Sequence, residues 1–203
     1  MKTAREIRHA IEYAAVRGAL FMAGAFPLRL GRAIGACAGW LAFALRIRRD
    51  VSVDNIRQAL GVSTGEATRI ARRSYQNLGR GLIEFAAFRR WSRDELLAQV
   101  TVDGIENLEA ARAAGRGAVI VAGHFGSWEI GGVIIPALGF PASVIVGEQT
   151  NARVDDVMND LRSAHNLGII TKTSALKKAL TTLRNNEFVA LLADQDARKG
   201  GIV

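Results

Sequence analysis

The first 50 residues contain two apolar runs that are separated by arginines. The runs cover residues 18–28 and 33–45, with Arg29 and Arg32 between them. Each run is shorter than the roughly 20 apolar residues that a helix needs to cross a bilayer. Arginines also follow the second run, which is typical of helices in a membrane interface. The pattern predicts two apolar helices that lie in or dip into the interface, or alternatively a helical pair packed on a soluble body.

The next 50 residues show a helical pattern with a basic polar face. Apolar residues recur at helical spacing between residues 64 and 91. The arginines of the same stretch are Arg69, Arg72, Arg73, Arg80, Arg89 and Arg90. They fit a solvated helix face, and they leave open a surface that binds nucleic acid.

From residue 102 onward, short apolar strands alternate with helices. Strand patterns occupy residues 118–122, 143–146, 168–172 and 188–193. The alternation predicts an α/β fold, a mostly parallel sheet with flanking helices, preceded by an all-helical, membrane-associated N-terminal region.

We therefore divide the chain into three predicted parts. Residues 1–50 form apolar and basic membrane-associated helices, residues 51–100 form a helical segment that packs on the body, and residues 101–203 form the α/β domain. Because the chain stops just as another strand pattern begins after Gly200 and Gly201, we expect this domain to be incomplete.

The excess of positive charge is confined to the N-terminal half. Of a formal net charge of +8, residues 1–100 hold 17 Lys and Arg against 8 Asp and Glu, whereas residues 101–203 hold 10 against 11. Such a block suits nucleic acid or an anionic bilayer. Aromatic residues form only 6% of the chain, which argues against stacking on bases. With one cysteine and no ligand-spaced histidines, we expect no metal, and no cofactor motif is present.

Reactive groups follow three of the predicted strands. They lie in residues 123–129, 147–153 and 194–199. Ligands of an open parallel sheet bind beyond the carboxyl ends of its strands. We therefore expect these three segments to converge on one edge and to form the site.

Within the first of these segments, His124 leaves a buried strand and Glu129 stands five residues further on. An imidazole that acts as a general base needs a group to hold its tautomer and to stabilise the cation that forms. A carboxylate in the first turns of the following helix could reach back to do this. The spacing predicts a catalytic pair of His124 and Glu129, and the alternative is a core histidine beside a surface glutamate.

The segment Gly123-His124-Phe125-Gly126-Ser127-Trp128-Glu129 resembles the signature of the bacterial lipid A biosynthesis acyltransferases. The phosphatidylinositol mannoside acyltransferases share this signature, and the glycerophosphate acyltransferases resemble it more distantly. Further stretches that resemble the family, in the family's order, are residues 46–55, 75–84 and 192–196.

The resemblance implies an O-acyltransferase, with His124 as the general base and Glu129 as its partner. The fatty acyl chain would pass from an acyl carrier protein or coenzyme A thioester to a hydroxyl of a lipid A precursor or similar glycolipid. Arg153, or alternatively Arg162, would steady the oxyanion or a substrate phosphate. Asp194 and Gln195 match the later motif and are expected to bind substrate.

Together with the basic, apolar N-terminus, the resemblance places the protein at the cytoplasmic face of the bacterial inner membrane. Its expected partners are a membrane lipid acceptor and an anionic bilayer surface, and not nucleic acid. Alternative acceptors are glycerophosphate or a mannosylated inositol lipid. Two further readings are a basic nucleic-acid-binding protein and a membrane scaffold without catalytic residues.

Overall fold

The computed structural model describes residues 3–195, and residues 1–2 and 196–203 lie outside the described part. The chain forms two compact units, residues 1–14 with 88–203 and residues 15–87. Helix α1 (Ala4–Ala25) begins in the first unit and ends in the second. The predicted three-part division at residues 50 and 100 stays a prediction.

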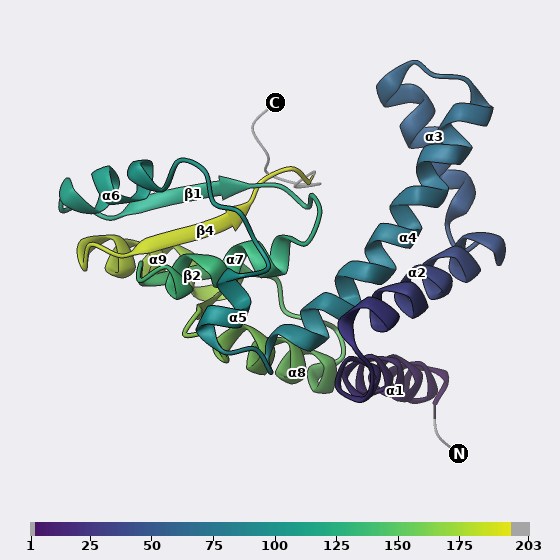
Figure 1. Cartoon of the computed structure of the whole chain (residues 1–203), viewed down its shortest axis with the longest axis horizontal. Helices are drawn as coiled ribbons and strands as arrows, with labels where there is room; N and C mark the ends of the chain where they lie inside the picture. Colours follow the sequence, from purple (N-terminus) through teal and green to yellow (C-terminus); the bar gives the residue numbers. More distant parts are fainter. Residues whose placement is uncertain (1–2, 196–203) are drawn as a thin grey trace. The chain divides into compact units, whose positions relative to one another are not determined.

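The unit of residues 15–87 is helical, as predicted. It contains α2 (Leu28–Ala44), α3 (Arg49–Leu60) and α4 (Thr64–Phe88), which ends at its border (Figure 1). Pro27 separates α1 from α2, because its ring restricts the backbone of the residue before it and it has no amide hydrogen to donate. In the residues that the structure describes, no single helix is long and apolar enough to cross a membrane. Helices α2 and α3 are long and apolar enough when taken together, but the pair is bent by 92°.

Glycines allow α2 and α4 to cross at very short range. Gly35 of α2 lies against Gly79 of α4 so closely that a Cβ on either residue would overlap the carbonyl group of the other. Gly39 lies equally close to the backbone of Tyr75. Beyond the crossing, the Tyr75 hydroxyl donates to the Ile47 carbonyl over 2.6 Å. These contacts fix α4 against α2 and against the turn that follows α2.

The unit of residues 1–14 and 88–203 contains a four-stranded sheet in which every neighbouring pair is parallel. Its strands are β1 (Ala118–Ala122), β2 (Ala142–Val146), β3 (Gly168–Thr171) and β4 (Phe188–Leu192). Their order across the sheet is β1-β4-β2-β3, and Figure 1 shows β1 beside β4. The structure thus confirms the predicted parallel α/β architecture.

Helices flank this sheet and bury its centre. They are α5 (Arg93–Leu97), α6 (Ile105–Ala113), α7 (Trp128–Ala137), α8 (Ala152–Ser163) and α9 (Ala175–Arg184), with a 3₁₀ turn η1 (Lys172–Ser174) before α9. α7 contacts β2, whereas α9 contacts β2, β3 and β4. Phe188 and Val189 at the start of β4 are almost fully buried, together with Val133 of α7. The central strand β4 is therefore anchored in the core at the end opposite to the site.

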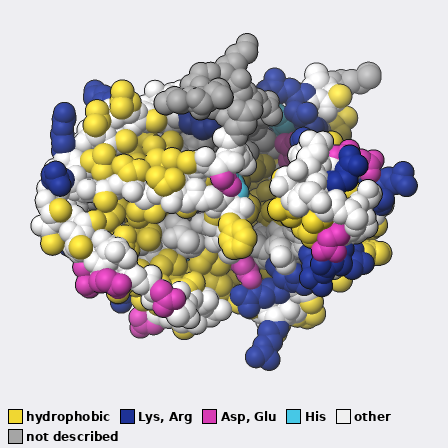
Figure 2. Space-filling view, turned by 90° about the horizontal axis from the view of Figure 1, so that it is seen from above, with side chains coloured by type: hydrophobic (Ala, Val, Ile, Leu, Met, Phe, Trp, Pro, Cys, Tyr) yellow, Lys and Arg dark blue, Asp and Glu magenta, His cyan; other side chains and the backbone are white. Residues whose placement is uncertain are grey.

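Strand β1 lies at the edge of the sheet and is the least covered. Val119 and Val121 alternate along it and are 50% and 66% exposed. Figure 2 shows hydrophobic side chains gathered on this part of the surface. The carboxyl end of β1, from which His124 extends, is consequently open to solvent.

Candidate active site

Two reactive residues meet where β1 and β4 end. The strands are neighbours and run in parallel, so their carboxyl ends lie at the same edge. The Ala193 amide donates to the Ala122 carbonyl over 3.0 Å, which extends the pairing by one residue beyond the strands. His124 stands two residues after the end of β1, and Asp194 stands two residues after the end of β4. The register of the two strands therefore brings together two side chains that are 70 residues apart in sequence.

Asp194 binds His124 through both carboxylate oxygens. Oδ1 lies 2.8 Å from Nδ1 of the imidazole, and Oδ2 accepts the backbone amide of His124 over 2.7 Å. A carboxylate at Nδ1 favours the tautomer with the proton on Nδ1 and leaves the lone pair of Nε2 as the acceptor. The His124 side chain is 31% exposed, so it is accessible from solvent.

Hydrogen bonds also keep Asp194 ionised. The contacts from the side chain and the backbone of His124, in that order, hold the pKa of the Asp194 carboxyl below its usual value. The carboxylate can therefore stabilise an imidazolium that forms beside it.

The turn after β1 shapes this contact. A Cβ on Gly123 would lie 3.2 Å from Oδ2 of Asp194, closer than side-chain atoms normally approach, so the missing side chain makes room for the carboxylate. Gly126 has a positive φ of 58°, which favours glycine. The ring of Trp128, the first residue of α7, packs edge-on against the imidazole with centroids 5.3 Å apart. The imidazole is thus held by a carboxylate on one nitrogen and by an aromatic ring beside it.

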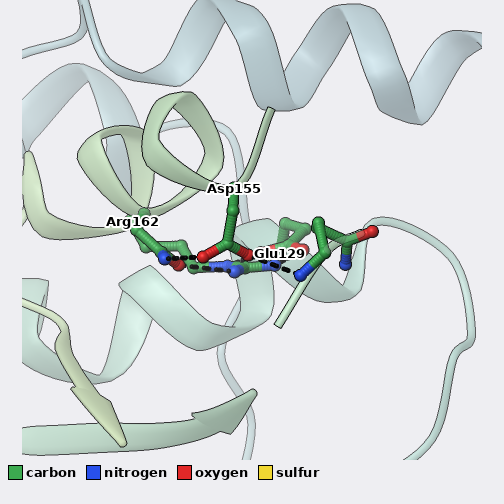
Figure 3. Close-up of polar contacts among 5 residues, drawn as sticks. Glu129, Asp155 and Arg162 are labelled. Atoms are coloured by element: carbon green, nitrogen blue, oxygen red, sulfur yellow. Dashed lines mark hydrogen bonds and ion pairs between the residues drawn. The ribbon is translucent and has the colours of Figure 1, made fainter. Parts of the chain in front are cut away.

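Glu129 does not take the position that the sequence analysis predicted. It pairs with Arg162 of α8, whose Nε and terminal nitrogen donate to its two carboxylate oxygens over 2.9 and 2.6 Å (Figure 3). The carboxylate bound to His124 is that of Asp194. The reason is that α7 begins at Trp128, so Glu129 belongs to its first turn and faces the guanidinium of the neighbouring helix α8. The catalytic role predicted for Glu129 stays a prediction.

The other predicted substrate residues occupy different surroundings. Arg162 is only 8% exposed and donates to Glu129 and Asn159, so its guanidinium is directed at protein groups. Arg153 is exposed at the start of α8, with its guanidinium over the ring of Tyr13 at 5.9 Å. Gln195 is exposed directly after Asp194. Of the last predicted segment, residues 196–199 lie outside the described residues.

Sequence reasoning named both members of the His124–Asp194 contact, yet it did not pair them. The order β1-β4-β2-β3, which makes the two loops neighbours, is not encoded in any local pattern. The equivalent positions of the two residues after two apolar strands were the available signal. Within residues 3–195, the structure has no group of three His, Cys, Asp or Glu residues that could hold a metal ion.

Comparison with known proteins identifies the family of this chain. An α/β fold with a histidine and an acid at one sheet edge is suited to group transfer, and the sequence matches the family described as bacterial lipid A biosynthesis acyltransferase over residues 1–203. The chain belongs to this family, which confirms the resemblance seen in its motifs.

Two curated relatives share 27% identity with the chain. They are a lipid A biosynthesis palmitoleoyltransferase of Escherichia coli strain K12 and a lipid A biosynthesis acyltransferase of Shigella flexneri. Each match extends over 173 residues, which are 84% of this chain and 55% of the relative. The chain thus spans about half the length of the curated relatives that it matches.

Proposed function

We propose that the protein is an O-acyltransferase that moves a fatty acyl chain from a thioester to a hydroxyl of a lipid A precursor or a similar glycolipid. The observation that carries this proposal is the contact between Nδ1 of His124 and the Asp194 carboxylate at 2.8 Å. It equips a solvent-accessible imidazole to accept a proton on its other nitrogen. Family membership and the names of the two relatives support the acyl group and the acceptor class.

The proposed reaction needs one base and no protein nucleophile. Nε2 of His124 takes the proton of the acceptor hydroxyl as its oxygen attacks the thioester carbonyl, and a C–O bond forms. The C–S bond then breaks, and the proton passes from the imidazolium to the departing thiolate. The donor is an acyl carrier protein or coenzyme A thioester, and the free thiol is the second product.

Asp194 has the orienting role that a general base requires. Its carboxylate holds the imidazole in the productive tautomer and offsets the positive charge that appears on His124 during attack. Because Asp194 also accepts the backbone amide of His124, it fixes the loop as well as the ring. This leaves Glu129 and Arg162 as a partly buried ion pair that fixes the first turn of α7, directly after the base.

The oxyanion needs donors of its own. Amides in the first turn of α7 are one source, since the first N–H groups of a helix have no partner within it. Arg153 and Gln195, both exposed near the carboxyl ends of the strands, are candidates to bind the phosphates or hydroxyls of the substrate. A guanidinium suits a phosphate because it is planar and always charged.

We further propose that the unit of residues 15–87 contacts the bilayer at the cytoplasmic face of the inner membrane. Large apolar side chains that this unit exposes include Phe21, Leu30, Trp40, Leu41, Leu45 and Ile47. Arg46 and Arg48 are exposed beside them. Apolar side chains flanked by arginines suit a surface of anionic lipids, which would bring a lipid acceptor to the enzyme.

The test of the proposed reaction is acyl transfer by the complete gene product, with a lipid A precursor as acceptor and an acyl thioester as donor. His124→Ala is expected to lower kcat by at least about 10²-fold, because a general base contributes roughly 10²–10⁴. His165→Ala serves as the matched control, since His165 binds the Phe88 carbonyl and has no part in the reaction. Turnover of His124→Ala at the wild-type rate, in a protein that melts normally, would contradict the proposal.

A further inference from the structure

Three polar residues lie on one face of α8 and form a hydrogen-bonded chain. Asp155, Asn159 and Arg162 are spaced four and three residues apart, which places them along the same side of a helix. The Asn159 amide donates to Oδ2 of Asp155 over 3.0 Å, and its oxygen accepts from Arg162 over 3.0 Å. Figure 3 shows this line of contacts, which continues to Glu129.

The hydrogen-bonded row of Asp155, Asn159 and Arg162 joins two segments that belong to the proposed site. At one end, Arg162 holds Glu129 in the first turn of α7, directly after the loop of His124. At the other end, Oδ1 of Asp155 accepts the backbone amide of Gln149 over 2.8 Å. Gln149 belongs to the loop after β2, and β2 is the neighbour of β4, which Asp194 follows. One face of α8 therefore connects the first turn of α7 with the loop after β2.

Each of these three side chains has a polar group that is hydrogen-bonded to the next side chain in the row. Arg162 is buried at 8% exposure, and a buried guanidinium is costly unless its donors are satisfied. Asn159 supplies one acceptor and, through its own amide, is itself oriented by Asp155. Asn159 thus connects the carboxylate of Asp155 to the guanidinium of Arg162.

The loop that Asp155 holds presents polar side chains to solvent. Glu148, Gln149 and Thr150 are all exposed. The next residue, Asn151, is buried and donates to the His9 carbonyl and to Glu12 of α1, so the far end of the loop is anchored as well. The loop is consequently held through the backbone of Gln149 and the side chain of Asn151, while the side chains of Glu148, Gln149 and Thr150 stay exposed to a ligand.

We propose that Asp155 and Asn159 are positioning residues for acyl transfer, acting on the first turn of α7 through Arg162 and on the loop of residues 147–151 through the Gln149 amide. The inference rests on the proposed function. Loss of the link to Arg162 loosens the helix that follows His124, which lowers kcat. Loss of the link to Gln149 releases the exposed loop, which raises the KM for the acceptor.

Two substitutions of Asp155 separate these effects. Asp155→Asn has the same shape and keeps an acceptor for the Gln149 amide, but its new amide can pair with Asn159 only if Asn159 turns its oxygen away from Arg162. We expect kcat to fall about tenfold with an unchanged acceptor KM, since one hydrogen bond to a charged group is worth roughly tenfold. Asp155→Ala removes both links, and we expect the same fall in kcat with an acceptor KM raised about tenfold.

Asp160→Ala is the matched control, because it removes the same charge from an exposed position on the same helix. The inference is overturned if Asp155→Asn keeps the wild-type kcat, or if Asp155→Ala behaves like Asp160→Ala. Its failure is distinct from failure of the proposed function. If only the inference about Asp155 fails, His124→Ala is inactive and the Asp155 variants have normal activity. If the proposed function fails, His124→Ala itself stays active.

Discussion

Asp194 shows how much of the site depends on one side chain. Its two oxygens bind the ring and the backbone of His124, and these bonds lower the pKa of its carboxyl. A carboxyl whose pKa is lower in the folded protein than in the unfolded chain stabilises the fold above its unfolded pKa, which is about 3.9 for aspartate. The stabilisation is lost as the pH falls through the lower, folded value.

The lowered pKa of Asp194 leads to a prediction for the pH dependence of stability. Above about pH 4, the free energy of unfolding of the wild type should exceed that of Asp194→Asn by a small amount, because the contact is solvent-exposed. The difference should shrink as the pH falls below about 4. Denaturant unfolding at a series of pH values measures it, and a difference that grows as the pH falls below about 4 would contradict the contact.

The limits of sequence reasoning are clearest for Glu129. His124 could be singled out because it follows a buried strand, and the motif drew attention to Glu129 because it is close in sequence. In the structure, proximity comes instead from the register of β1 with β4. A pairing across 70 residues is set by sheet order, and local periodicity carries no information about that order.

Among the elements, the crossing of α2 and α4 depends on glycine more than on the apolar pattern. Gly79 contacts the backbone of Gly35, whereas Gly81, two residues further along α4, has no neighbouring atom within reach of a Cβ. The strands and most helices could be predicted from hydrophobic spacing, since burial dictates that spacing. The close crossing of α2 and α4 could not be predicted in this way, because glycine has no side chain and leaves no periodic hydrophobic signal.

The two glycines provide a matched pair of substitutions. Gly79→Ala should lower the free energy of unfolding by about 1–3 kcal/mol, because its Cβ overlaps the Gly35 carbonyl and forces the helices apart. Gly81→Ala should raise it by up to about 1 kcal/mol, because alanine favours the helix and meets no obstacle. Denaturant unfolding of both variants checks the crossing, and equal effects would contradict it.

For the molecule as a whole, the separation of charge bears on the proposed contact with a bilayer. The N-terminal half holds the excess of arginine, and exposed apolar side chains accompany it in the unit of residues 15–87. The proposed active site lies in the other unit. A protein that acts on an amphiphile needs both properties, a surface for the bilayer and a site for the transfer.

Binding to vesicles tests this division. Replacing Arg46 and Arg48 together by glutamine should weaken binding to vesicles that contain anionic lipid by roughly tenfold or more, at about 1 kcal/mol per arginine. Replacing Lys177 and Lys178, exposed on α9, removes the same charge and should have a smaller effect. Added salt should weaken wild-type binding. Equal losses in the two variants would argue against a membrane surface at Arg46 and Arg48.

We propose that His124 and Asp194 act as one catalytic unit, and a double-mutant cycle of acyl transfer tests this most directly. The kcat of the complete gene product is measured for His124→Ala, Asp194→Asn and the double variant. If Asp194 acts through His124, the double variant is no slower than His124→Ala alone. If the two losses multiply, Asp194 acts independently of the imidazole, and the account of the site is wrong.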